Sequence, residues 1–126
     1  MKIDNTLKPA DLNKAIKHVF DAAATKVRSI DRTWNPADGT PVFTVEGKYT
    51  TRGWTEWTQG FVYGCALLCF DAMNDRKMLE LGRKRTVDLM APHVTHIGVH
   101  DHGFNNLSTY GNLRRLMNEG RIKHNE

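Results

Sequence analysis

The sequence contains little cysteine, the residue whose disulfide bonds crosslink small extracellular domains. Cysteine occurs only twice in 126 residues, at Cys65 and Cys69, which is too few for a disulfide framework and leaves no second pair to complete a zinc site. We interpret both as small hydrophobic residues of a buried helix. The longest apolar stretch, Phe61 to Phe70, is shorter than the roughly 18 residues that cross a bilayer, so we expect no membrane contact.

No apolar core of a secretion signal follows the first lysine, an observation that leaves cytoplasm and periplasm both open. The formal charge is +4 and the pI is near 9.2, but lysine and arginine are interspersed with acidic residues along the chain. The basic C-terminal segment lacks the aromatic residues that accompany nucleic-acid binding, so we interpret it as a solvated helix end and expect neither a nucleic-acid partner nor a cofactor. This segment contains Arg114, Arg115, Arg121 and Lys123.

Apolar residues recur at helical spacing in several segments, which predicts an all-α fold. The first amphipathic helix is expected from Ala10 to Ile30, and a short extended excursion or hairpin from Pro41 to Thr51, where β-branched and aromatic residues surround Gly47. From Trp57 to Met73 apolar residues cover nearly the whole circumference, so this helix must be buried on most sides.

Two glycines inside that buried helix, Gly60 and Gly64, each lower helix propensity by about 1 kcal/mol relative to alanine. We therefore expect another element to pack closely against them. Asn74-Asp75 predicts a break followed by a helix N-cap, and a half-exposed helix should run from Arg76 to Met90. After Pro92, a polar loop should lead into a last helix that begins near Phe104 and ends at Gly120.

Outer and inner helices thus alternate along the chain, as in the repeat of a toroidal helical barrel. A hairpin takes about 40 residues, so this length holds two hairpins and some lead-in, whereas closing a ring of six would need far more chain. We therefore predict that residues 1–126 form a single incomplete domain of such a barrel. The exposed side of its inner helix would be covered either by the remainder of the barrel or by self-association.

Two motifs carry the candidate functional residues. The first is Trp57-Thr58-Gln59-Gly60-Phe61-Val62-Tyr63-Gly64, at the start of the buried helix, and the second is His100-Asp101-His102-Gly103-Phe104. Both resemble motifs of glycoside hydrolase family 88, the unsaturated glucuronyl hydrolases. Between them, Met73-Asn74-Asp75 is similar to a turn that the family builds from threonine, glycine and aspartate. The chain departs from the family pattern at Val62, where bulky aromatics are common, and at Asn105-Asn106, where apolar residues are usual.

The resemblance implies that the chain is the N-terminal third of an (α/α)6 barrel. The complete enzyme would remove 4,5-unsaturated uronic acid from the non-reducing ends of oligosaccharides by hydrating the double bond. The resemblance identifies Asp101 as the first of two catalytic aspartates, and Trp57 and His100 as substrate-binding residues. The second aspartate, the proton donor, would lie outside this chain, so we expect the isolated 126 residues to be inactive.

The residues also suggest a role for Asp101 without the family. An aspartate between a polar loop and a helix can act as an N-cap and accept the free amide protons of the first turn, which would lower its pKa. Trp57 can stack on a sugar face or serve as packing. Trp54 matches no family position, and Trp34 is assigned to packing.

A metal site is the competing interpretation of the histidines. The candidate ligands are His93, His96, His100, Asp101 and His102, and spacings of three and four residues could bring imidazoles together on a helix. Pro92 and Gly98 instead favour an extended chain that would scatter these side chains to both faces, so we expect no metal. Two rival functions remain: a non-catalytic helical binding or assembly module, and another (α/α)6 sugar enzyme. Linkage preference, sulfation preference and oligomeric state are not encoded in these segments.

Overall fold

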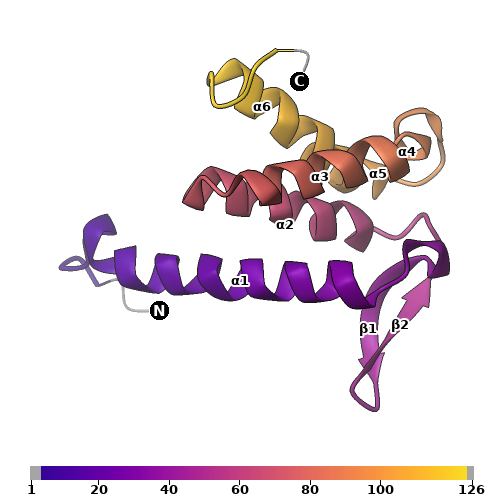
Figure 1. Ribbon diagram of the computed structural model, residues 1–126, viewed down its shortest axis with the longest axis horizontal. Coiled ribbons are helices and arrows are strands. Elements are labelled where there is room, and N and C mark those ends of the chain that lie inside the picture. The colour runs from indigo at the N-terminus through magenta and orange to yellow at the C-terminus, as the bar shows by residue number, and fades with distance from the viewer. Residues whose placement is uncertain (1–3, 125–126) are drawn as a thin grey trace.

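A computed structural model describes residues 4–124 and is mostly helical, with one two-stranded antiparallel sheet. A 3-10 turn (Pro9–Leu12) leads into the long helix α1 (Asn13–Thr33). Figure 1 shows α1 running beneath the other helices and extending beyond them at its amino end. None of the helices in this part of the chain is long and apolar enough to cross a membrane.

The hairpin expected at 41–51 is present and is one residue longer at each end. Strand β1 (Thr40–Val45) pairs with β2 (Lys48–Arg52), and the two residues that connect them, Glu46 and Gly47, have positive φ angles of 50° and 75°. Two consecutive left-handed residues are typical of the tight turns that match the twist of paired strands. A 3-10 turn (Pro36–Asp38) connects α1 to the hairpin.

Helices α2 (Thr58–Met73) and α3 (Arg76–Leu89) form an antiparallel hairpin at the centre of the molecule. The predicted turn between them is confirmed, because Asn74 adopts the left-handed conformation and the Asp75 carboxylate accepts a hydrogen bond from the Lys77 amide at 3.0 Å. Residues of α2 and α3 also supply most of the core, which contains Ala66, Leu67, Cys69, Phe70, Met78 and Leu79.

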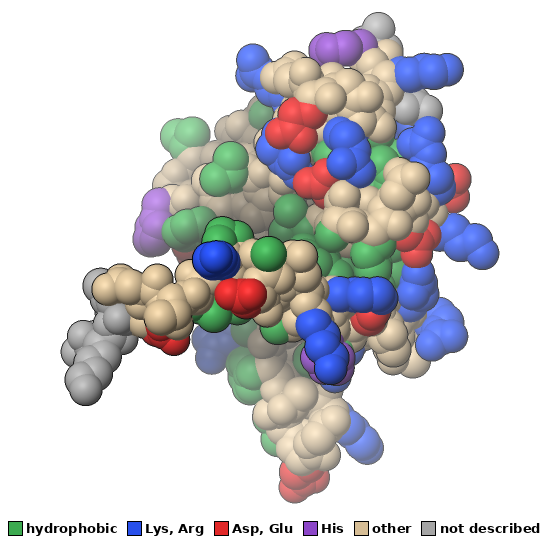
Figure 2. Space-filling view, turned by 90° about the vertical axis from the view of Figure 1, so that its left-hand side faces the viewer, with side chains coloured by type: hydrophobic (Ala, Val, Ile, Leu, Met, Phe, Trp, Pro, Cys, Tyr) green, Lys and Arg blue, Asp and Glu red, His purple; other side chains and the backbone are tan. Residues whose placement is uncertain are grey.

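Helix α2 is not enclosed on every side. Phe61 and Leu68 are 43% and 42% exposed, and they lie seven residues apart on one side of the helix. Figure 2 shows several hydrophobic side chains at the surface on the left of the view, whereas most of the lysine and arginine side chains in this view lie on the right. Apolar surface and basic surface are thus unevenly distributed over this side of the molecule.

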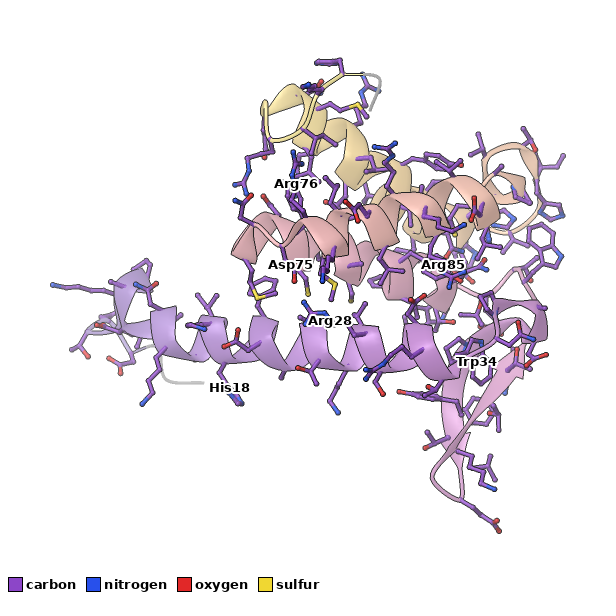
Figure 3. All side chains as sticks on the ribbon, in the orientation of Figure 1. His18, Arg28, Trp34, Asp75, Arg76 and Arg85 are labelled. Atoms are coloured by element: carbon purple, nitrogen blue, oxygen red, sulfur yellow. The ribbon has the colours of Figure 1, made fainter. Side chains whose placement is uncertain are left out.

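Two ion pairs attach the carboxyl half of α1 to α3. Arg28 contacts Asp75, as Figure 3 shows, and Arg85 donates to the Asp31 carboxylate through Nη2 at 2.6 Å and Nε at 3.1 Å. The amino half of α1 lacks such attachments among the described residues, and its Val19 is 60% exposed.

The final helical segment consists of α5 (His102–Asn106), a π-helical turn (Leu107–Gly111) and α6 (Asn112–Asn118). It begins two residues before the predicted start at Phe104. A further element was not predicted: Pro92 does not introduce an extended segment but opens a single helical turn, α4 (Pro92–Thr95). Proline is well tolerated at a first helical position because the amide that it lacks would have no intrahelical partner there.

Candidate functional site

The two motif-bearing segments are held together by a close backbone contact. A Cβ atom added at Gly60 would lie 2.4 Å from the Asn105 Cα, and one at Gly64 would lie 2.6 Å from the Ser108 carbonyl oxygen. Both glycines are therefore required by the crossing of α2 with α5 and the π-helical turn. The expectation that another element packs closely against them is confirmed.

Beside this crossing lies an open hollow with a volume of about 310 Å³. It is lined by Trp57, Phe61, Asp101 and Phe104, so one wall comes from the start of α2 and the other from the entrance to α5. The amino ends of α2 and α5 lie at the same end of the molecule in Figure 1. The structure thus brings together two of the residues identified from the motifs, Trp57 and Asp101.

The aromatic residues of the hollow form a partly exposed surface. The Trp57 and Phe61 rings meet edge to face with centroids 5.3 Å apart, and the Phe61 and Phe104 rings are 6.4 Å apart and tilted by 40°. Each of the three side chains is between 43% and 50% exposed. Flat apolar surface beside one carboxyl group suits a ligand with an apolar ring face and hydroxyl groups.

The predicted capping role of Asp101 is wrong. Its backbone is helical (φ −63°, ψ −17°), and its side chain makes no cap hydrogen bond. An N-cap side chain reaches back to the amides from an extended backbone. Here the amides of His102 and Gly103 instead donate to the carbonyls of Val99 and His100. The Asp101 side chain remains available to the hollow.

His100 lies next to the hollow but is not among its lining residues. Its side chain is 90% exposed, and its Nε2 is 3.4 Å from the Asp101 Oδ1. Protonated His100 would pair with the Asp101 carboxylate at the rim of the hollow. Its predicted contact with substrate stays a prediction.

Behind the hollow, α4 brings together histidines that an extended chain would have scattered. His93 Nδ1 is 2.9 Å from His102 Nδ1, and His96 Nδ1 is 2.7 Å from His102 Nε2. At the inner end, His93 Nε2 donates to Gln59 Oε1 at 2.8 Å. The expectation that Pro92 and Gly98 would separate these imidazoles is wrong, because the single turn after Pro92 places His93 and His96 on one side.

Trp54 covers this histidine chain. Its ring stacks on His102 with centroids 5.5 Å apart and an interplanar angle of 19°, and it meets His96 edge-on at 4.9 Å. Trp54 matches no position of the two sequence motifs, so no role was expected for it. Its partners are about 40 to 50 residues away in sequence, so no local pattern could have shown them.

Burial is the main reason that the pKa of His93 lies below its ordinary value, and the neighbouring His102 and His96 lower it further. His93 and His102 are buried, whereas His96 is exposed. The inner end of the chain therefore favours neutral imidazole.

The ring nitrogens do not converge on one point, because His102 directs opposite nitrogens toward His93 and His96. Within residues 4–124, no group of three or more histidine, cysteine, aspartate or glutamate side chains is arranged to hold a metal ion.

Part of the basic C-terminal segment forms ion pairs within the protein. Arg115 pairs with Asp71 at 2.8 Å, and Arg121 pairs with the same carboxylate at 3.4 Å.

Trp34 lies away from the hollow and serves packing, as predicted. Its indole N–H donates to the Gly39 carbonyl at 2.9 Å, and its ring meets Tyr49 edge-on. It borders an enclosed cavity of only about 20 Å³ between α1, the hairpin and α2, which has room for little more than one water molecule.

Comparisons with known proteins add no relative. No family model matches the chain, and no curated protein or solved structure matches it. Function must therefore be argued from the residues and their arrangement.

Proposed function

We propose that this chain is the N-terminal part of a glycoside hydrolase that removes 4,5-unsaturated uronic acid from the non-reducing ends of oligosaccharides. The observation that carries the proposal is the shared hollow of Trp57 and Asp101. These residues come from two motifs that are 44 positions apart in sequence and that were identified independently of any structure. Two unrelated sequence matches would have no reason to meet at one surface.

The chemistry of the hollow supports a carbohydrate ligand. Trp57 and Phe104 expose ring surface on which the apolar face of a pyranose can lie, and the indole π system can stabilise positive charge that develops on the sugar. The Asp101 carboxylate can accept hydrogen bonds from sugar hydroxyls. In the proposed reaction, a second carboxylic acid outside this chain protonates the double bond, and water adds to the resulting cation and returns a proton to that carboxylate. The hemiketal that forms then opens and releases the rest of the oligosaccharide. The charge of Asp101 would help to keep that acid protonated, because like charges disfavour ionising both groups.

The apolar face of α2 supports the proposed (α/α)6 architecture. Phe61 and Leu68 on α2, with Ile16 and Val19 on α1, are between 42% and 60% exposed. Burying such apolar surface would stabilise the protein by about 25 cal/mol for each Å² removed from water. The remainder of a barrel would cover this face, and self-association of the chain is the alternative.

A non-catalytic helical binding or assembly module is the second candidate function, and the same apolar face favours it. The two candidates differ in what the hollow does. An assembly module would need the apolar side of α2 but not the Asp101 carboxylate. An enzyme would need both Trp57 and Asp101.

The loss of ultraviolet absorbance of an unsaturated uronyl disaccharide tests the proposal. The complete protein should consume the double bond, and Asp101→Asn should abolish turnover, whereas Asp38→Asn, an exposed change near the hairpin, should not. The 126-residue chain should bind the disaccharide without turnover. Turnover by the complete protein that is insensitive to Asp101→Asn would contradict the assigned role.

A further inference from the structure

Asn105 connects both walls of the hollow to the histidine chain. Its Oδ1 accepts from the Gly60 amide at 2.7 Å, and its Nδ2 donates to the Glu56 carbonyl at 3.1 Å. The same Nδ2 lies 3.3 Å from His93 Nδ1. Asn105 is fully buried. In sequence, Trp57 lies between its two backbone partners, Glu56 before α2 and Gly60 in the first turn of α2. One carboxamide thus links the backbone on both sides of Trp57 to the helix that Asp101 precedes.

The hydrogen-bond partners fix where the protons of the histidine chain lie. Gln59 Oε1 can only accept, so His93 Nε2 carries a proton and neutral His93 offers an unprotonated Nδ1. That nitrogen accepts from His102 Nδ1, and therefore His102 Nε2 accepts from His96 Nδ1. With all three rings neutral, each contact has one donor and one acceptor.

We propose that Asn105 and the chain His96, His102, His93 form a positioning network that sets how Trp57 faces Asp101, and that this network is intact only while His93 is neutral. A proton added to His93 Nδ1 would oppose the N–H of Asn105, whichever tautomers His102 and His96 adopt. A proton on His96 or on His102 can be accommodated, because His96 can carry a proton on Nε2 and each contact between the rings then keeps one donor and one acceptor.

Within residues 4–124, no carboxylate is among the groups that act on His93. The groups that face His93 and His102 are Trp54 from the segment before α2, Gln59 from α2, His96 from α4 and Asn105 from α5. Two acidic residues lie in the same segments: the Asp101 carboxylate pairs with His100 at 3.4 Å, and Glu56 accepts from Asn105 through its backbone carbonyl. The charges that act on His93 are those of His102 and His96, and both disfavour protonation.

Fluorine NMR of the full chain with 5-fluorotryptophan at its three tryptophans tests this network. Trp54 contacts all three histidines, so its resonance should shift in steps as the pH falls, and the lower step should be that of His93, whose pKa lies below its ordinary value. The Trp57 resonance should follow only the lower step, at a pH below the ordinary histidine value of about 6.5. Trp34, at the hairpin, should stay unchanged throughout.

Two variants sharpen the test. Asn105→Asp keeps an acceptor for the Gly60 amide but places a carboxylate beside His93, so the shared lower midpoint of Trp54 and Trp57 should move to higher pH. Asn118→Asp makes the same change at an exposed position of α6 and should leave it unmoved.

A Trp57 resonance that ignores the lower step, or that moves only together with Trp34 and the helical circular dichroism, would overturn the proposal. The use of the network for sugar binding rests on the proposed function, but this measurement contains no sugar. A chain that keeps the coupling and binds no disaccharide would contradict the proposed function alone.

Discussion

The Asn105 side-chain oxygen accepts a hydrogen bond of 2.7 Å from the Gly60 amide, in the first turn of α2 and 45 residues away in sequence. This bond lies where α2 and α5 approach each other too closely for a side chain at position 60. The two motifs of the sequence are joined there, and the hollow that Trp57 and Asp101 line lies beside it.

Gly60→Ala should destabilise the protein by about 1–3 kcal/mol, because the added methyl group would meet the backbone of Asn105, which cannot rotate away. Urea unfolding followed by circular dichroism measures the change. The matched control is Gly103→Ala on α5, where nothing lies within 4 Å of an added Cβ. That substitution should be neutral or should stabilise by up to about 1 kcal/mol. Equal effects at the two positions would contradict the close crossing.

Stability should decrease as the pH falls below about 6.5. The pKa of His93 is lowered in the folded chain, so the unfolded chain takes up a proton at higher pH than the folded chain does. The loss should begin near the ordinary histidine pKa and should end below the folded one. The free energy of unfolding, measured between pH 8 and pH 5, should therefore decrease as the pH falls.

The His93→Gln variant should lose much of that pH dependence, although it will also be less stable at pH 8. His18→Gln, at an exposed position on α1, should keep the full dependence. Stability that rises between pH 6.5 and pH 5 in the unmodified chain would mean that His93 gains a proton favourably on folding.

Asp31→Asn should cost about 1 kcal/mol, since this carboxylate receives two hydrogen bonds from Arg85 and both side chains are less than 35% exposed. Asp21→Asn removes the partner of Lys17 in a pair whose side chains are 76% and 52% exposed, and it should cost less than about 0.5 kcal/mol. Thermal unfolding of both variants at low and high salt compares them. A larger loss for Asp21→Asn would show that α1 is attached differently.

Trp57→Ala should weaken binding of an unsaturated uronyl disaccharide by about tenfold, which corresponds to about 1.4 kcal/mol. Trp34→Phe should not change it, because Trp34 packs against the hairpin. Calorimetric titration of the two variants gives the comparison. Similar losses for both would assign the effect to general destabilisation.

The local elements of this fold could be predicted because their signals are local. The apolar run of α2, the Asn74-Asp75 turn and the hairpin at Gly47 each show a periodicity or turn residue within a few positions. The pair Gly60 and Gly64 even indicated a close neighbour, although not which one.

The contacts that complete the site could not be predicted in the same way. Asn105 reaches Gly60 and Glu56 across 45 and 49 residues, and Trp54 reaches His102 across 48. A single helical turn such as α4 is too short to show a period, so Pro92 was interpreted as a stop. The capping role expected for Asp101 failed because the choice between a side-chain and a backbone acceptor depends on a few backbone angles.

Amide chemical-shift mapping with an unsaturated uronyl disaccharide tests the central claim most directly. The largest changes should fall on Trp57, Phe61, Asp101 and Phe104, the residues that line the hollow, and Asp101→Asn should reduce them. Changes centred elsewhere, or no changes at millimolar disaccharide in a folded chain, would contradict the assignment of this hollow to carbohydrate.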